Sequence, residues 1–249
     1  TRNFTHPKFR VFRNTGYTFM FLNLNHEQKK SDHYIFEQIK TAFATEPNIA
    51  ATIHGQRKIF QGCYGRRTAL FPSKKCGGAI PTESRLELAH AVCLERNPTV
   101  INYRSQALKI TLSQNNYCYP DFLIQTIDGS YEVHEVKPSV ASLALDEYIR
   151  FDRLATLLSS IGITFKLIDQ TELPKENQLQ QLLYWYQRGH RFDWSKLEIE
   201  QALNLLKTKQ LENPIQVYQE LESIGLKQEL GDYLFFHNKF KEFPPKYNY

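Results

Sequence analysis

The stretch from residue 119 to residue 137 reads YPDFLIQTIDGSYEVHEVK. The pair Asp128-Gly129 is typical of tight turns, and it separates two runs that have the character of β-strands. We therefore expect a β-hairpin with strands at about residues 119–127 and 130–137. In a hairpin the start of the first strand lies beside the end of the second, so the two ends of this stretch lie together.

Charged side chains gather at these joined ends. Successive side chains of a strand point to opposite faces, so Glu135 and Lys137 share one face while His134 takes the other and is interpreted as structural. Asp121, near the start of the first strand, lies beside them in the hairpin. Carboxylates are the hard oxygen ligands that Mg²⁺ prefers, and a neighbouring lysine can stabilise charge or orient a water. These residue types suit metal-dependent hydrolysis of a phosphodiester.

Each candidate also has an ordinary structural explanation. A Pro-Asp pair often marks a chain reversal, which would account for Asp121, and Glu135 with Lys137 can form a surface ion pair of little energy. Glu87, a fourth candidate, follows Ser84 by three residues, which is the spacing of a capping box at a helix start. That helix directly precedes the other acidic residues, so its first turn can face the same cleft. Spacing alone leaves both interpretations open.

The surrounding elements predict a compact α/β unit. A helix at about residues 82–96 and a long strand at 99–112 come before the hairpin. An amphipathic helix at about 142–161 follows, with Gly162 at its C-terminal cap, and a strand at 164–169 comes next. The crossover helix should return this last strand parallel to the sheet.

We divide the chain into two domains, residues 1–174, with a core at about 82–170, and residues 175–249. In the first eighty residues the clearest expectation is a helix near 31–43. Three helices are expected in the second domain, at about 177–187, 195–208 and 214–224. A short hairpin turning at Gly231-Asp232 would complete a winged-helix-like module that binds DNA or a partner protein.

Basic and aromatic residues alternate between residues 56 and 75. Such a mixture can neutralise phosphates and stack on unpaired bases, and a solvated loop with scattered core aromatics explains it equally well. The candidate nucleic-acid contacts are Arg57, Lys58, Arg66, Arg67, Lys74 and Lys75.

Composition sets broad limits. With 41% hydrophobic and 23% charged residues and no long apolar run, the chain reads as a globular protein without a membrane span. The start lacks a secretory leader, so we expect a cytoplasmic, bacterial protein that associates with the nucleoid when it acts. Its four cysteines lack the spacing of a zinc site. A net charge of +5 permits a polyanionic partner without proving one.

Pro120-Asp121 followed by Glu135-Val136-Lys137 resembles the PD-(D/E)xK nuclease signature, and the expected order of elements resembles the restriction-endonuclease-like core of that superfamily. Three segments narrow the likeness to the TnsA endonuclease subunit of heteromeric cut-and-paste transposases. They are Arg85-Leu86-Glu87-Leu88-Ala89, Asp121-Phe122-Leu123 and Val136-Lys137-Pro138. The resemblance covers residues 80–170 well, the C-terminal region in architecture only, and the first eighty residues weakly.

The resemblance implies a Mg²⁺-dependent endodeoxyribonuclease that leaves a 5′-phosphate and a 3′-hydroxyl, with Mn²⁺ as a substitute. It implies that Glu87, Asp121, Glu135 and the Val136 carbonyl are metal ligands for two ions per site, and that Lys137 is the catalytic lysine. The best-known family member has glutamine where this chain has Glu135. The extra carboxylate should strengthen cation binding.

In the family, this subunit cleaves the 5′ ends of the transposon, which are the non-transferred strands. An integrase-like transposase cuts and joins the 3′ ends, and an ATPase regulator contacts the C-terminal region. The resemblance therefore implies double-stranded transposon-end DNA and these two proteins as partners. The alternatives are a stand-alone restriction- or repair-type nuclease and a non-catalytic DNA-binding assembly factor. The assembly factor would usually have lost an acidic residue or the lysine, and all are present here.

Overall fold

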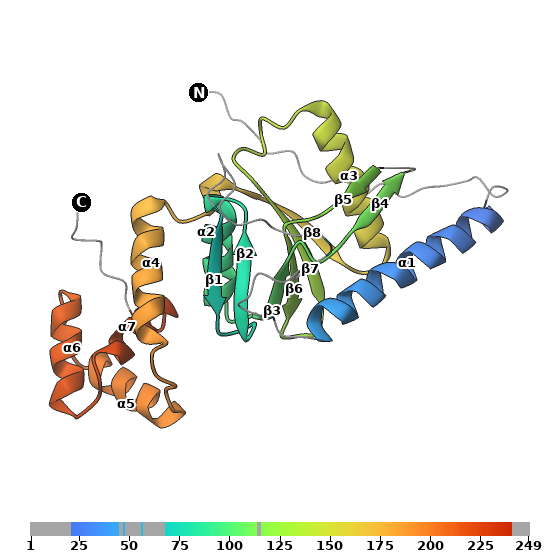
Figure 1. Ribbon diagram of the computed structural model, residues 1–249. Helices are drawn as coiled ribbons and strands as arrows, with labels where there is room; N and C mark the ends of the chain where they lie inside the picture. The colour runs from blue at the N-terminus through green and yellow to red at the C-terminus, as the bar shows by residue number, and fades with distance from the viewer. Residues whose placement is uncertain (1–20, 45–46, 48–55, 57–67, 114–115, 241–249) are drawn as a thin grey trace.

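The computed structural model describes residues 21–44, 47, 56, 68–113 and 116–240. The chain forms a mixed α/β body followed by a group of helices, which are coloured orange to red in Figure 1. No helix in these ranges is long and apolar enough to cross a membrane.

A four-stranded sheet in the order β3-β6-β7-β8 forms the centre of the α/β body. Its strands are β3 (Val100–Ser105), β6 (Phe122–Thr126), β7 (Tyr131–Lys137) and β8 (Thr164–Asp169). The first three are antiparallel, and β8 runs parallel to β7. Helix α3 (Leu145–Ser160) makes the crossover between these parallel neighbours, as the sequence predicts.

The β6–β7 hairpin is confirmed. Gly129 has a φ of 83°, a left-handed conformation that glycine adopts without strain. The Asp128 carboxylate accepts hydrogen bonds from the Thr126 hydroxyl at 2.6 Å and from the Ser130 amide at 3.0 Å. The strands pair Phe122 with His134, so one residue further along Asp121 lies beside Glu135.

Helices cover both faces of this sheet. Successive side chains along a strand point to opposite faces and so enter two different hydrophobic cores. Helix α2 (Arg85–Arg96) packs on the face that carries Phe122 and Ile124. Leu123, which lies between them in β6, belongs to the opposite core with residues of α3 and of α1 (Phe21–Ala44). Helices therefore pack against both faces of the sheet.

The single long strand predicted at residues 99–112 is wrong. Strand β3 ends at Ser105, and β4 (Ile110–Ser113) pairs with β5 (Asn116–Cys118) in a separate sheet. The break falls at Gln106, whose φ of 46° is incompatible with an extended strand. A further two-stranded sheet, β1 (Ala69–Ser73) with β2 (Gly78–Thr82), precedes α2 and was not predicted.

The helices that follow the α/β body agree with the sequence until the last element. Helices α4 (Glu176–Gly189), α5 (Lys196–Lys207) and α6 (Pro214–Ser223) end within two residues of the expected positions. The hairpin at Gly231-Asp232 is wrong, because these residues lie in helix α7 (Glu229–Phe236). Among the described residues this region has no strand and hence no wing.

The error at Gly231 has a packing cause. A side chain at this position would meet the ring of Tyr218 at 3.0 Å, so the glycine permits close contact between α6 and α7 rather than a turn. Leu230 and Leu234, four residues apart on α7, are both fully buried, which is the period of a helix.

Glu95, near the end of α2, joins four parts of the fold through one buried carboxylate. Only 1% of the residue is exposed. The donors within reach of its two oxygens come from the end of β1 and the turn after it, from β3 and from α4. They are the amides of Lys74 (3.0 Å) and Lys75 (3.1 Å) and the hydroxyls of Ser73 (2.6 Å), Tyr103 (2.9 Å) and Tyr186 (3.2 Å).

We predict that Glu95→Ala lowers the free energy of unfolding by ~3 kcal/mol, because it leaves several buried donors without an acceptor. Tyr103→Phe removes one donor and should cost about 1 kcal/mol. Urea unfolding followed by circular dichroism measures both. Glu200→Ala, at an exposed position of α5, is the control and should change stability by less than about 0.5 kcal/mol. Equal stability of Glu95→Ala and the control would contradict the role of Glu95.

Candidate active site

Asp121 is fixed at the mouth of β6 by the neighbouring strand. Its Oδ2 accepts a hydrogen bond of 2.8 Å from the Val136 amide of β7. The side chain is half-buried. This bond ties the first acidic residue of the hairpin to the strand that carries Glu135, so the two carboxylates keep their relative position.

Glu135 and Lys137 share a face of β7, as the strand period predicts. Oε1 of Glu135 lies 3.0 Å from Nζ of Lys137, and this ammonium also lies 5.2 Å from the ring centre of Phe151 on α3. Glu135 is 7% exposed, and its buried Oε2 has no hydrogen-bond partner among the described residues. A buried carboxylate oxygen in this state is a candidate ligand for a cation.

Glu87 takes part in the cap of α2. The Ser84 hydroxyl accepts from the Glu87 amide at 3.1 Å, and Oε2 of Glu87 accepts from the Glu83 amide at 2.8 Å. The capping interpretation is therefore correct, although the reciprocal bond comes from Glu83 rather than from Ser84. Glu87 is nevertheless buried. The charge of Glu135 raises the pKa of Glu87, and the charge of Glu87 in turn raises the pKa of Asp121.

Electrostatics link the three carboxyl groups. Burial raises the pKa of Asp121 well above its ordinary value, and the nearby charges of Glu135 and Glu87 raise it further, against the Val136 amide and Lys137, which lower it. Burial also raises the pKa of Glu87, partly offset by the hydrogen bonds of its cap. The charges of Glu135 and Glu87 thus disfavour the charge of Asp121, and the charge of Glu135 disfavours that of Glu87, a conflict that a bound cation would relieve.

The donor set fits a hard divalent cation in its chemistry. Carboxylates and a backbone carbonyl are the ligands of Mg²⁺, and one oxygen of Glu135 is unpartnered among the described residues. Within those same residues, however, no three His, Cys, Asp or Glu side chains lie close enough to hold a metal ion as they stand. Binding by three of these side chains would therefore require some of them to turn, whereas one or two carboxylates with a backbone carbonyl and water already suit Mg²⁺.

His134 points to the other face of the sheet and has a structural environment. Its Nδ1 lies 3.0 Å from Nε2 of His90 on α2, and its Nε2 lies 2.8 Å from the Glu132 carboxylate. Lys166 of β8 also contacts that carboxylate, at 2.7 Å. Burial lowers the pKa of His90 to about 3 and lowers that of His134. The pair is neutral near pH 7 and packs α2 onto the sheet.

The predicted nucleic-acid contacts are only partly visible. Arg57, Lys58, Arg66 and Arg67 lie outside the described residues. Lys74 and Lys75 occupy the β1–β2 turn, where Lys75 donates through Nζ to the carbonyls of Leu94, at 3.0 Å, and Asn97. Lys74 is mostly exposed, and its Nζ lies 3.5 Å from Asp193. Lys74 is thus freer than Lys75 to meet a phosphate.

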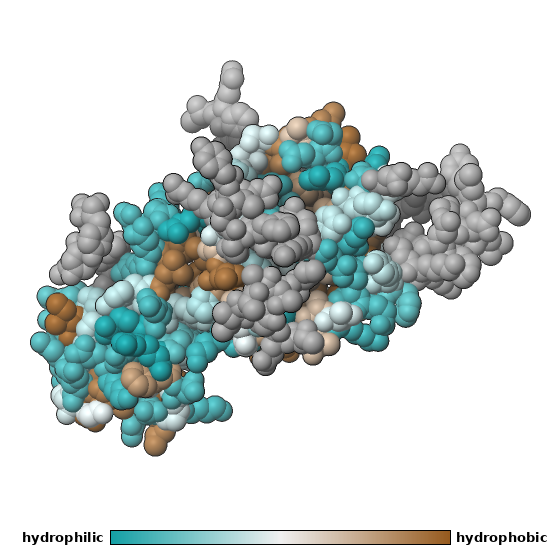
Figure 2. All heavy atoms as spheres, viewed as in Figure 1, coloured by the Kyte–Doolittle hydropathy of each residue, from teal (hydrophilic) through white to brown (hydrophobic). Residues whose placement is uncertain are grey.

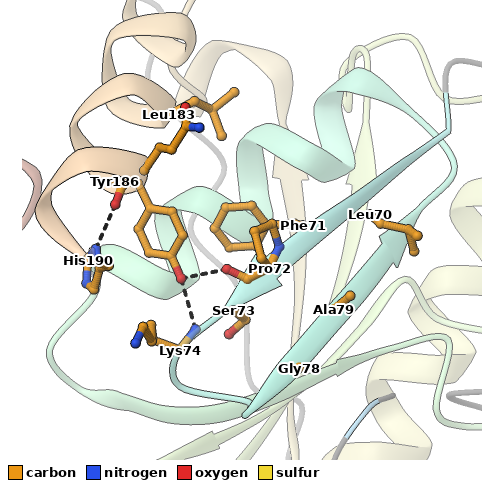
Figure 3. Close-up of a pocket in the computed structure, with 11 residues that line it drawn as sticks. Leu70, Phe71, Pro72, Ser73, Lys74, Gly78, Ala79, Leu183, Tyr186 and His190 are labelled. Atoms are coloured by element: carbon orange, nitrogen blue, oxygen red, sulfur yellow. Dashed lines mark hydrogen bonds between the residues drawn. The ribbon is translucent and has the colours of Figure 1, made fainter. Parts of the chain in front are cut away.

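A separate cavity of about 620 Å³ lies between β1 and α4 (Figure 3). Its walls are mostly apolar, with Phe71, Pro72 and Leu183 among them, and the hydroxyl of Tyr186 bonds to the backbone of β1 within it. Figure 2 shows apolar surface where α4 faces this sheet. The cavity contains no carboxylate, so it is distinct from the candidate active site.

Neither a family model nor a curated protein matches the chain.

We predict that Asp121→Asn stabilises the protein at neutral pH. A carboxyl group with a raised pKa in the folded state favours folding only while protonated, and this contribution is lost as the pH rises through that pKa. Asparagine removes the charge but can still accept from the Val136 amide, so the free energy of unfolding should rise by roughly 1 kcal/mol at pH 7. The gain should vanish below the ordinary pKa of 3.8.

Urea unfolding in EDTA at pH 7 and pH 3 measures this difference. Asp128→Asn is a control of opposite sign. Hydrogen bonds from Thr126 and Ser130 lower the pKa of Asp128 to about 2, so its carboxylate supports folding at neutral pH, and the variant should lose stability there. A loss of stability in Asp121→Asn at pH 7 would refute the repulsion between the site carboxylates.

Proposed function

We propose that the chain is a metal-dependent DNA endonuclease in which Glu87, Asp121, Glu135 and Lys137 form the catalytic site. The observation that supports the proposal is the geometry at the open end of the β6–β7 hairpin, where the start of β6 lies beside the end of β7. There the Asp121 carboxylate is bonded to the Val136 amide at 2.8 Å, and Glu135 is paired with Lys137 at 3.0 Å. Half-buried Asp121 and buried Glu135, with a lysine on the same pair of strands, suit hydrolysis of a phosphodiester, because they place hard oxygen donors beside an ammonium group.

Glu87, Asp121, Glu135 and the Val136 carbonyl are the groups that would hold Mg²⁺ or Mn²⁺. When bound, the cation would supply Lewis-acid activation of the phosphodiester and of the attacking water. Lys137 neutralises charge on the scissile phosphate or orients the water, and Phe151 and Glu135 restrict where its ammonium can move. Water adds to phosphorus and the bond to the 3′ oxygen breaks, so the products carry a 5′-phosphate and a 3′-hydroxyl.

The order of elements supports a restriction-endonuclease-like core. Helix α2, the antiparallel strands β3, β6 and β7, the crossover helix α3 and the parallel strand β8 follow one another around the site. In this proposal residues 1–174 form the catalytic domain, and the helices of residues 175–249 form a second domain that binds a partner or DNA. The fold alone does not select a substrate, so the proposal depends on the side chains of the site.

The narrower proposal is a transposase subunit that cuts the non-transferred strands at the transposon ends. It rests on the resemblance of residues 85–89, 121–123 and 136–138 to TnsA. An integrase-like transposase would act on the other strands, and an ATPase regulator would bind through the C-terminal helices. The site carries all three acidic residues and the lysine, which favours a catalytic subunit over an assembly factor.

We predict that Asp121→Ala and Lys137→Ala each abolish Mg²⁺-dependent cleavage of transposon-end DNA, with losses of at least about a thousandfold. Cleavage is measured with and without the partner transposase, and the cut strand is mapped on a sequencing gel. Folding and partner binding should survive, because both side chains lie at a strand end rather than in the core.

Asp152→Ala, an exposed carboxylate of α3, is the control and should cut like the parent chain. Undiminished cleavage by Asp121→Ala would refute the assignment of the active site. Cleavage of unrelated DNA at full rate without the transposase would instead support the stand-alone nuclease.

A further prediction concerns the basic residues of the segment between residues 56 and 75. Neutralising Arg66, Arg67 and Lys74 together should weaken DNA binding and reduce the slope of log affinity against log salt by about 3. Fluorescence anisotropy at several salt concentrations measures the slope. Lys75→Ala should change the slope less, because its ammonium already serves two carbonyls. An unchanged slope in the triple variant would remove these residues from the DNA interface.

A further inference from the structure

Gln106 connects several parts of the candidate site. It follows β3, is only 1% exposed, and has a φ of 46°, which is unusual for a residue with a side chain. Its amide donates to the Asp121 carbonyl at 2.9 Å, and its carbonyl accepts from the Gln56 amide at 2.9 Å. Its side-chain Nε2 donates to Oε2 of Glu83 at 3.3 Å. One residue thus contacts the strand that carries Asp121 and the segment that leads into α2.

Glu83 continues this chain of bonds to the second acidic residue of the site. Its backbone amide donates to Oε2 of Glu87 at 2.8 Å. A continuous path therefore runs from the Asp121 backbone through Gln106 and Glu83 to the Glu87 carboxylate. The path crosses from the sheet to the helix and joins two groups that are 34 residues apart in the sequence.

The left-handed backbone at Gln106 supports a specific role for its side chain. This conformation costs a residue with a Cβ about 1 kcal/mol, and glycine adopts it freely. Glycine would keep both backbone bonds but would lose the bond to Glu83. The residue with the strained backbone is thus the one whose side chain reaches Glu83, just before α2.

We propose that Gln106 and Glu83 are positioning residues, which hold the Glu87 carboxylate at a fixed place relative to Asp121 for the reaction. This inference rests on the proposed function. Gln106 orients the Glu83 carboxylate, and Glu83 in turn fixes the first turn of α2 and its main-chain bond to Glu87. Neither residue touches the reacting phosphate in this arrangement.

The test is a double-mutant cycle on the full chain with two measurements. Mn²⁺ affinity is measured by isothermal titration calorimetry, and cleavage is measured in Mg²⁺ with the partner transposase. Gln106→Gly and Glu83→Ala should each weaken Mn²⁺ affinity and slow cleavage by about tenfold. The double variant should be no worse than either single one, because all three lose the same bond.

Two variants separate positioning from a general structural effect. Glu83→Gln keeps the main-chain amide and a carbonyl that can accept from Gln106, so it should restore most of the affinity and rate. Asn238→Gly relaxes another left-handed residue, with a φ of 50°, at an exposed site beyond α7, and should change neither. Thermal unfolding checks that every variant is folded.

The proposal is overturned if the two single losses multiply in the double variant, or if Glu83→Gln is as impaired as Glu83→Ala. It is also overturned if the parent chain takes up no Mn²⁺. A chain that binds Mn²⁺ but cuts no DNA with its partners would instead refute the nuclease function. The calorimetric cycle would then decide the positioning role by itself.

Discussion

The buried carboxylate of Glu95 is the constraint around which the fold is arranged. A charge taken out of water must be surrounded by donors, and these come from the end of β1 and the turn after it, from Tyr103 of β3 and from Tyr186 of α4. Since no one element could supply them all, the carboxylate fixes three regions relative to α2. It also fixes α2 itself, whose first turn carries Glu87. The backbone of Glu87 is therefore anchored through the other end of the same helix.

The carboxylates of the candidate site have fewer hydrogen-bond donors around them than Glu95. Glu95 has donors at both oxygens, whereas Glu135 keeps one buried oxygen without a partner among the described residues. Burial and mutual repulsion raise the pKa of Asp121 and of Glu87, so these groups oppose folding when they are charged. A fold whose other buried polar groups are hydrogen-bonded can tolerate this local loss of folding free energy. Carboxylates with such raised pKa values are concentrated at functional sites.

The sequence predicts the parts of the fold that local patterns determine. The hairpin follows from its turn pair and strand alternation, and α4 to α6 follow from their helical periods and caps. It fails where distant contacts decide. Gln106 turns the chain out of β3 although glutamine has no local preference for that conformation, and Gly231 gives room to the ring of Tyr218 within a helix rather than forming a turn. The pairing of Glu135 with Lys137 is local and was predicted, whereas the links of Glu83 and Gln106 to the site depend on tertiary contacts and were not.

The two interpretations of Glu87 are compatible once their energies are compared. Its Oε2 caps α2 by accepting from the Glu83 amide, and in the proposed site the same carboxylate would face the cation. Loss of one capping bond costs only about 1 kcal/mol. Binding of a divalent cation by several carboxylates can exceed this, because it also removes their mutual repulsion. Under the proposed function, capping thus holds the Glu87 carboxylate at the start of α2, where a cation would bind it even if that one bond were weakened.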